Sequence, residues 1–217
     1  MGRKESIFAK AWRACKKVTL LCDYAFNTLK LRCFGIKAGR GSRVCGHIYL
    51  ERKDGAQVTI GRAFKCISGR GVNRIGRNLR SGIFASEGAQ ITIGDNVGVS
   101  CSSIWARKQI TIGNNVNIGA DCLIMDHDAH SLYYLHRRDR SLDSAHTASA
   151  PVVIEDDVLL GARCTVLKGV RIARGSVVGA GSIVTCDIPA GEIWAGNPAR
   201  FIRKVTETPQ PKTSNEL

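Results

Sequence analysis

The sequence predicts an all-β solenoid, a left-handed parallel β-helix of hexapeptide repeats preceded by a short N-terminal helical segment. Three observations predict this class. Aliphatic residues recur at every sixth position, smaller residues follow them four positions later, and the 217 residues include 23 glycines but only 6% aromatic residues. A core with so few rings and so many glycines favours thin, regularly stacked coils.

The spacing of six is unbroken in the C-terminal half of the chain. Its aliphatic positions are Ile154, Leu160, Val166, Ile172, Val178 and Val184, and the smaller residues that follow the first five are Val158, Cys164, Val170, Ser176 and Ser182. Neither an α-helix nor an alternating strand has a period of six. A triangular coil of three hexapeptides does, and its neighbouring turns lie about 4.8 Å apart. We therefore expect Ile172 directly over Ile154, one coil away.

The corners of the coils are also recognisable. Glycine, asparagine and acidic residues gather at 94–96, 113–115 and 155–157. These residue types favour the tight and sometimes left-handed backbone that a corner needs.

Residues 1–42 are expected to form a basic amphipathic helical segment and a lead-in, with one or two helices at roughly 4–31. Helical spacing relates Phe8, Trp12, Cys15, Thr19, Cys22, Phe26 and Leu29. A solenoid exposes unpaired strand edges at its ends, so we expect this apolar face to cap the first coil. The same pattern is typical of a helix lying on an anionic membrane, and that alternative stays open.

The repeats predict a β-helix domain at 43–205 with an inserted loop at 125–153, followed by a flexible tail at 206–217. The loop is polar, rich in His, Arg and Asp, and has no period of six. Loops inserted at the corners of a solenoid often carry its function.

Charge and cysteine content narrow the function classes. The net charge is +14, but no recognisable nucleic-acid-binding module accompanies it, so an anionic lipid, substrate or phosphorylated cofactor is the expected partner. The nine cysteines form no C-x-x-C pair, which disfavours a zinc site. Their odd number and the lack of a signal peptide predict reduced thiols in a cytoplasmic protein.

A succession of motifs resembles a known family. The segments Ile154–Val158, Gly169–Ile172, Val178–Ser182, Asp187–Pro189 and Ala195–Ala199 follow one another as in the C-terminal half of hexapeptide-repeat acyltransferases, the group of the maltose and galactoside acetyltransferases and bacterial polysaccharide O-acetyltransferases. The segment Asp126–Leu132 and the arginines at 137 and 138 are similar to the active-site loop of the polysaccharide-modifying branch. Leu159 departs from the family, since many relatives carry tryptophan there.

The resemblance, which covers about residues 60–205, implies an O-acetyltransferase. Its acetyl group would pass from acetyl-CoA to a hydroxyl of a sugar in a polysaccharide or its lipid-linked or nucleotide-linked precursor. It also implies a homotrimer, an active site between adjacent prisms, no metal, and coenzyme binding by Gly161, Gly179, Ala180, Gly196, Arg200, Arg203 and Lys204. An acetyltransferase for an antibiotic or serine, and a non-catalytic β-helix scaffold, are the alternatives. A zinc carbonic anhydrase on the same solenoid is disfavoured because a third histidine ligand is missing.

Attack by a neutral hydroxyl requires a general base, and histidine is the natural one near neutral pH. Four of the five histidines lie in the inserted loop. His130 is the first candidate, because Ser131 and Leu132 follow it as similar residues do in the relatives, and His127 is the second.

Other polar residues have candidate roles beside the base. Asp126 or Asp128 could fix the tautomer of the base, and Ser100 could contribute a polar group beside the reacting centre. Contact with the acceptor is expected from Arg137, Arg138 and Asp126. For each of these side chains a purely local structural role is the alternative.

Overall fold

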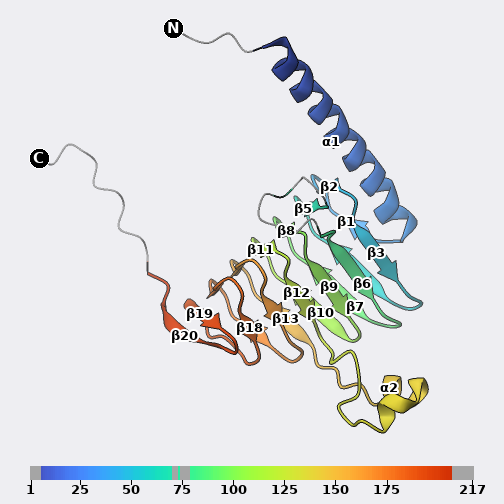
Figure 1. Cartoon of the computed structure of the whole chain (residues 1–217), viewed down its shortest axis with the longest axis vertical. Coiled ribbons are helices and arrows are strands. Elements are labelled where there is room, and N and C mark those ends of the chain that lie inside the picture. Colours follow the sequence, from blue (N-terminus) through green and yellow to red (C-terminus); the bar gives the residue numbers. More distant parts are fainter. Residues whose placement is uncertain (1–5, 70–72, 74–78, 207–217) are drawn as a thin grey trace, which may run out of the picture.

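The chain folds into one long helix followed by a three-sided solenoid (Figure 1). The computed structural model describes residues 6–69, 73 and 79–206. The predicted tail, apart from Thr206, lies outside the described residues. The solenoid starts at Lys37, before the predicted boundary at residue 43.

Three sheets form the faces of the prism. Sheet A contains β1 (Lys37–Ala38), β4 (Gln57–Ile60), β7 (Gln90–Ile93), β10 (Gln109–Ile112), β13 (Val152–Ile154) and β16 (Arg171–Ile172). Sheet B contains β2 (Arg43–Gly46), β5 (Lys65–Ser68), β8 (Gly98–Ser100), β11 (Asn117–Ala120), β14 (Leu159–Leu160), β17 (Val177–Val178), β19 (Glu192–Gly196) and β20 (Ala199–Lys204). Sheet C contains β3 (Tyr49–Arg52), β6 (Gly82–Ala85), β9 (Ser103–Ala106), β12 (Leu123–Met125), β15 (Thr165–Val166) and β18 (Ile183–Val184). The predicted left-handed parallel β-helix is thereby confirmed.

The register of the coils follows the period of six. Ile154 pairs with Ile172 across neighbouring strands of sheet A, and Leu160 pairs with Val178 in sheet B. All the aliphatic positions of the repeat from 154 to 184 are fully buried. Along β4, β7 and β10 buried and outward-facing residues alternate, so two aliphatic residues of each of these strands fill the interior.

The corners are stacked as well. Asn96, Asn115 and Asp157 adopt left-handed backbone with φ of 57°, 57° and 62°. Their side chains form a ladder in which the amide of Asn96 donates to Asn115 and that of Asn115 donates to Asp157, each over 3.1 Å. Asparagine and aspartate tolerate this backbone, which explains their repetition at the corners.

A single helix, α1 (Ile7–Cys33), covers the edge of β2. Its contacts come from its C-terminal half and are mainly polar, apart from an edge-on contact between the rings of Phe26 and His47. Asn27 donates to the carbonyls of Val44 (3.2 Å) and Gly46 (2.7 Å), and Asp23 accepts from the Gly46 amide over 2.8 Å. Leu31 adds a buried apolar contact.

The predicted capping face is wrong for Phe8 and Trp12, which are exposed by 88% and 64%; Phe26 is 50% exposed and contacts the ring of His47. The edge of a sheet presents unpaired N–H and C=O groups. These groups need hydrogen-bond partners more than apolar cover, and the polar residues beside the apolar face of the helix provide them. No described helix is long and apolar enough to cross a membrane.

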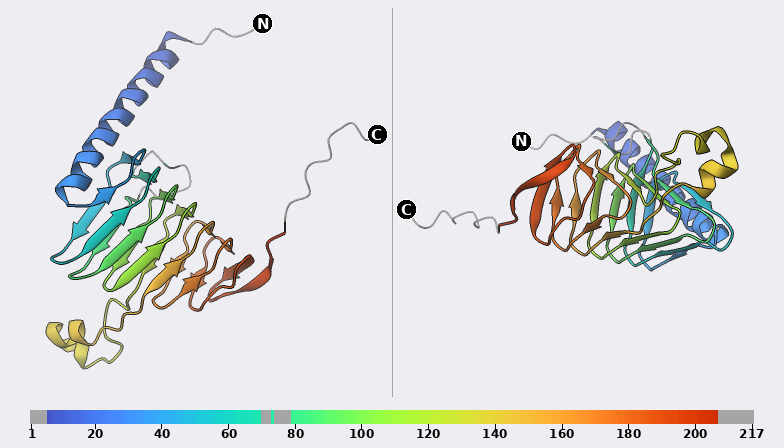
Figure 2. Two further views of the ribbon diagram at one scale, coloured as in Figure 1. Left: turned by 180° about the vertical axis from the view of Figure 1, so that it is seen from behind. Right: turned by 90° about the horizontal axis from the view of Figure 1, so that it is seen from below.

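Two departures from the plain solenoid shape the rest of the molecule. The inserted loop runs between β12 and β13. It is slightly shorter than the predicted segment 125–153, because Met125 and the last residues of that segment belong to these strands. The loop contains a short 3-10 helix, η1 (His136–Arg138), and the helix α2 (Arg140–Ala145). It projects from the prism in both views of Figure 2. At the far end, β20 turns back antiparallel to β19 and closes sheet B.

Candidate active site

The inserted loop is fixed to the coil by Asp126. Its carboxylate is fully buried and accepts three backbone N–H bonds of 2.6–2.7 Å, from Arg107, Lys108 and Gln109. Both oxygens are therefore used inside the protein. The predicted contact between Asp126 and the acceptor does not fit this geometry, since the side chain anchors the start of the loop.

His127 is buried at the root of the loop. Its Nδ1 accepts the backbone N–H of Ala129 over 2.9 Å, so the ring proton lies on Nε2. The Trp105 ring stands perpendicular to it with centroids 4.4 Å apart. Burial lowers the pKa of His127, an effect that the charge of Asp126 opposes and that of Arg107 reinforces. Because Nδ1 already accepts a backbone N–H and Nε2 carries the ring proton, His127 has no free lone pair, which is a poor arrangement for a general base.

His130 has the opposite surroundings. Its Nδ1 lies 2.6 Å from Oδ2 of Asp143 in α2, and its side chain is 70% exposed. The other carboxylate oxygen of Asp143 accepts the Ser131 N–H over 2.7 Å. The hydrogen bond from His130, followed by that from Ser131, lowers the pKa of Asp143. The charged carboxylate keeps a proton on Nδ1 and turns the Nε2 lone pair outward.

Asp143 was missed by sequence reasoning, which proposed Asp126 or Asp128 for this role. Asp128 instead forms an ion pair with Lys168, with 2.5 Å between Nζ and Oδ1. Asp143 lies 13 residues after His130 in sequence and reaches it only because α2 folds back over the loop. The one local signal is Asp139, which caps the start of α2 by accepting the amides of Ser141 and Leu142.

The two arginines that were predicted to contact the acceptor substrate differ in their own contacts. Arg137 donates to the carbonyls of Ser131 and Leu132 over 2.7 and 2.9 Å, and so holds the turn that follows His130. Arg138 is exposed, and its guanidinium lies 5.5 Å from the Tyr134 ring. Arg138 therefore remains available to a ligand, whereas Arg137 has a structural task in the loop.

Ser100 lies elsewhere in the chain. It belongs to β8 of sheet B and borders a shallow cavity with Lys65, Asn117 and Leu159, without any residue of the inserted loop. Its neighbour Ser102 is buried and uses its hydroxyl to donate to Gly119 and to accept from the Cys122 amide. Within one chain, Ser100 and the loop histidines are not brought together.

A groove on sheet C adjoins the root of the loop. One cavity of about 620 Å³ is lined by Lys53, Ser86, Glu87, Gly88, Trp105, Arg107, His127, Ala129 and Ser144. It shares Lys53, Ser86 and Trp105 with a second cavity of about 400 Å³, which extends to Glu51, Phe84, Ser103 and Leu123. Trp105 is 38% exposed at their junction. The groove thus combines an aromatic surface with charges of both signs.

The residues predicted to bind the coenzyme gather at one corner and one end of sheet B. Gly161 follows β14 and Gly179 follows β17, one coil apart. A methyl group on Gly161 would lie 2.5 Å from the Ala180 nitrogen, and one on Gly179 would lie 2.8 Å from the Ala195 Cβ. Close stacking of the coils therefore requires these glycines whether or not a ligand binds.

The remaining predicted coenzyme residues belong to the terminal hairpin. Gly196 pairs with Ala199 in it, and Arg200 pairs with Ala195, the residue that lies against Gly179. The side chains of Arg200, Arg203 and Lys204 are exposed. A strip of small residues is thereby flanked by positive charge, which fits the narrow pantetheine arm and the phosphates of coenzyme A.

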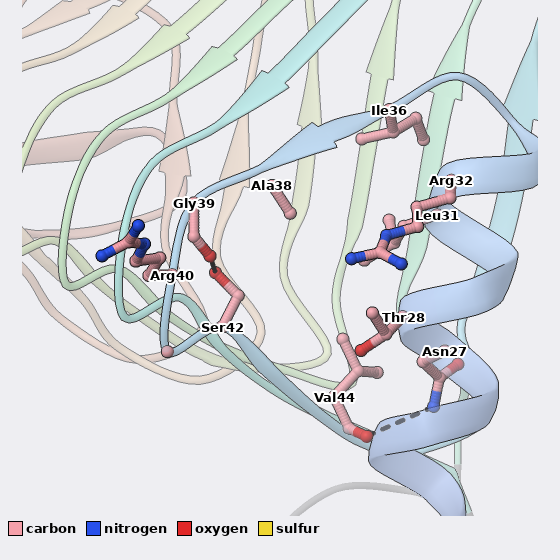
Figure 3. Close-up of a pocket in the computed structure, with 11 residues that line it drawn as sticks. Asn27, Thr28, Leu31, Arg32, Ile36, Ala38, Gly39, Arg40, Ser42 and Val44 are labelled. Carbon is pink, nitrogen blue, oxygen red and sulfur yellow. Dashed lines mark hydrogen bonds between the residues drawn. The ribbon is translucent and has the colours of Figure 1, made fainter.

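A separate cavity of about 330 Å³ lies at the N-terminal end of the solenoid, between α1 and the first coil. Figure 3 shows Arg32 on the helix and Arg40 on the first corner at its border, with Leu31 and Val44 nearby. It contains neither the loop histidines nor the predicted coenzyme residues. Among the described residues, no group of three or more His, Cys, Asp or Glu side chains is placed to hold a metal ion.

Stacked hexapeptide coils with a histidine-bearing loop define the class of this protein, a left-handed β-helix of the hexapeptide-repeat type. A family model described as a hexapeptide repeat of succinyl-transferase matches residues 109–124 and 151–186. Over 65 residues the chain is 49% identical to a 2,3,4,5-tetrahydropyridine-2,6-dicarboxylate N-acetyltransferase of Staphylococcus aureus, a match covering 30% of this chain and 27% of that protein. The chain thus spans little more than a quarter of the length of these curated relatives.

Solved structures resemble the chain over most of its length. A mutant of AntD, an N-acyltransferase from Bacillus cereus in complex with dTDP-4-amino-4,6-dideoxyglucose and coenzyme A, has a TM-score of 0.64 at 15% identity and covers 83% of this chain and 90% of its own. The hexapeptide-repeat acetyltransferase VCA0836 from Vibrio cholerae has a TM-score of 0.52 at 27% identity and covers 93% and 95%. The first likeness concerns the fold alone. The predicted resemblance to hexapeptide-repeat acetyltransferases is confirmed by these matches.

Proposed function

We propose that this protein is a cytoplasmic, acetyl-CoA-dependent O-acetyltransferase that modifies a sugar hydroxyl in a polysaccharide or in its lipid-linked or nucleotide-linked precursor. The observation that carries the proposal is the pair formed by His130 and Asp143. A carboxylate 2.6 Å from Nδ1 holds an exposed histidine with its second nitrogen outward. This is the arrangement that a general base for a hydroxyl needs.

The chemistry assigned to the pair is a proton relay. His130 accepts the proton of the acceptor hydroxyl at Nε2 while that oxygen forms a bond to the acetyl carbonyl carbon. The bond from carbon to sulfur then breaks, and His130 returns the same proton to the departing thiolate. Asp143 stays ionised throughout and stabilises the imidazolium that exists between the two transfers. Acetyl-CoA, when bound, supplies the activated acetyl group.

The donor side of the proposal rests on sheet B. The strip formed by Gly161, Gly179 and Ala180 leaves room for a slender chain along the corner, and the exposed cations at 200, 203 and 204 suit phosphate oxygens. The solved relative from Vibrio cholerae, which is described as an acetyltransferase, is similar over 93% of this chain. Both observations favour an acyl-CoA donor.

The acceptor side rests on the groove beside Trp105. Exposed aromatic faces pack against the apolar faces of sugar rings, while Lys53, Glu87 and Arg107 can bond hydroxyl or anionic groups. The fold neighbour AntD was solved with a dTDP-linked amino sugar, which favours a sugar nucleotide or a related glycoside here. The Staphylococcus aureus relative acts on a small dicarboxylate, so an acetyltransferase for a small molecule is the second candidate.

We further propose that the enzyme is a homotrimer. In a single chain His130 is 70% exposed, which leaves its Nε2 in bulk water rather than in an enclosed site. A neighbouring prism packed against this face would enclose the reacting centre and exclude water from it. Nine free cysteines, none in a disulfide, support the cytoplasmic location.

The test of the proposed activity is an assay of free coenzyme A thiol with purified protein, acetyl-CoA and a panel of acceptors. We expect acceptor-dependent thiol release with nucleotide sugars or oligosaccharides. The rate of release with serine or chloramphenicol should be much lower. Mass spectrometry should place the new acetyl group on oxygen, through its lability to mild base. If serine or chloramphenicol supported thiol release and no sugar did, the proposed acceptor would be a small molecule and not a sugar. No acceptor-dependent release from any compound would favour the scaffold alternative.

Asp143→Asn is expected to lower kcat by roughly 10²-fold, because an amide can present the wrong atom to Nδ1 and cannot stabilise the imidazolium. Steady-state kinetics measures this effect.

Asp139→Asn is the matched control for that variant. It removes one carboxylate from the same loop but retains a good helix cap, so it should keep the wild-type kcat. Equal losses in the two variants would assign Asp143 a purely structural role.

A further inference from the structure

Helix α1 carries an apolar stripe that the described part of the chain leaves largely exposed. The stripe consists of Phe8, Trp12, Cys15, Cys22, Phe26 and Leu29, all of them exposed. Their spacing of three, four and seven residues places them along one side of the helix. Two of them, Phe8 and Trp12, are large aromatic residues near the start of the helix, where they pack into no described core. A row of exposed rings of this length indicates a binding surface.

The stripe touches the solenoid near its C-terminal end, where the ring of Phe26 lies edge-on against the ring of His47 with centroids 5.3 Å apart. Further contacts with the first coil use Asp23, Asn27 and Leu31, which lie beside the stripe in the C-terminal half of the helix. The helix has 27 residues, so it is about 40 Å long. Its N-terminal half extends beyond the first coil, as both ribbon figures show. The free half therefore presents Phe8 and Trp12 at the tip of the molecule.

The charge around the stripe selects the partner. Between residues 6 and 46 there are nine Lys or Arg residues and a single acid, Asp23. That acid already accepts a hydrogen bond from the Gly46 amide. Lys10 and Lys17 lie on the side opposite the stripe, and Arg32 and Arg40 continue the positive surface to the cavity at the first coil. A second copy of this surface would be repelled by its like charge, whereas anionic lipid would be attracted.

We propose that the apolar stripe of α1 docks the protein on an anionic membrane surface. The helix lies in the headgroup region with Phe8 and Trp12 inserted among the acyl chains, and its lysines and arginines contact lipid phosphates. Burying the rings supplies the apolar part of the binding, and the cations supply a part that salt weakens. This docking is independent of the reaction proposed above, although it would bring the loop histidines to lipid-linked acceptors.

Flotation of the full-length protein with vesicles tests the proposal. The protein should float with vesicles of equal parts phosphatidylcholine and phosphatidylglycerol, and much less with phosphatidylcholine alone. High salt should reduce the bound fraction. The variant Phe8→Gln/Trp12→Gln should weaken binding at least about tenfold, because it removes the inserted rings without changing charge. Circular dichroism should show that its helix content is kept.

The matched control is Phe201→Gln/Ile202→Gln. It removes two comparably exposed apolar side chains from β20 at the other end of the solenoid, so it should bind vesicles as the wild type does. Light scattering of each variant provides the second measurement. Equal binding by the wild type and the Phe8/Trp12 variant would overturn the proposal, as would no binding by the wild type. Loss of assembly in that variant, with unchanged vesicle binding, would make the stripe a contact between copies instead.

Discussion

Replacing His130 with alanine is expected to lower kcat by roughly 10²–10⁴-fold, the usual contribution of a positioned general base. The affinity for coenzyme A should hardly change, because the residues proposed to bind it lie on sheet B and not in the inserted loop. The physical reason is the arrangement at the ring. Asp143 fixes the proton on Nδ1 over 2.6 Å, and the outward Nε2 is the nitrogen that can take a proton from the acceptor.

Rescue of the same variant by imidazole separates loss of the base from disruption of the loop. His130→Ala leaves space at an exposed position, so added imidazole should restore part of the rate if the missing function is proton transfer. Turnover with and without imidazole, together with equilibrium binding of coenzyme A, measures the effect.

His127→Ala is the informative comparison. Its ring is buried against Trp105 and accepts the Ala129 amide, so its removal should destabilise the root of the loop and lower the melting temperature. Loss of rate in this variant should not be rescued by imidazole. Near-normal turnover of His130→Ala, combined with an inactive but fully folded His127→Ala, would move the role of base to His127.

Truncating Ile172 to alanine is expected to destabilise the protein by about 2–5 kcal/mol, as large-to-small changes in a close-packed core do. Ile172 is completely buried. It pairs with Ile154 on one side and bridges to Ile188 on the other, so it lies between two coils. Neighbouring coils are held by their own backbone hydrogen bonds and cannot collapse into the space, which keeps the cost towards the upper part of the range.

Denaturant unfolding at one fixed protein concentration measures this cost, because assembly makes stability depend on concentration. Ile202→Ala is the matched control. It removes the same atoms from an exposed position in β20, and such surface changes usually stay within about 0.5 kcal/mol. Equal effects of the two variants would contradict the register, since they would imply that Ile172 is no more buried than Ile202.

Much of the solenoid could be predicted because its order is a property of the chain itself. A period of six places one aliphatic residue on each face, and the pairing of Ile154 with Ile172 follows from three such steps. The left-handed corners at Asn96 and Asn115 follow from residue types that tolerate positive φ. Each coil repeats the environment of the previous one, so a local pattern is enough to specify a long-range contact.

The function of the helix was less predictable. Helical spacing identified the apolar side correctly, but spacing alone does not say what that side contacts. The first coil offers unpaired backbone groups at its edge, and Asp23 and Asn27 satisfy them through hydrogen bonds. An apolar side chain such as Phe26 cannot satisfy such groups. The helix therefore contacts the first coil mainly through polar residues beside the expected face, and the rings of Phe8 and Trp12 remain exposed.

For the candidate site, too, some features were predictable from the sequence and others depended on the tertiary structure. Sequence by itself determined the solenoid, its register, and the loop in which a catalytic histidine was to be sought, because these depend on residue type and regular spacing. Sequence ranked His130 ahead of His127 by resemblance, whereas only the tertiary structure showed which nitrogen of each ring is already bonded and how deeply each ring is buried. Only it revealed Asp143 as the partner of His130. The inserted loop has no repeat, and its contacts are set by the fold of α2 and by the anchoring of Asp126 to amides of the preceding coil.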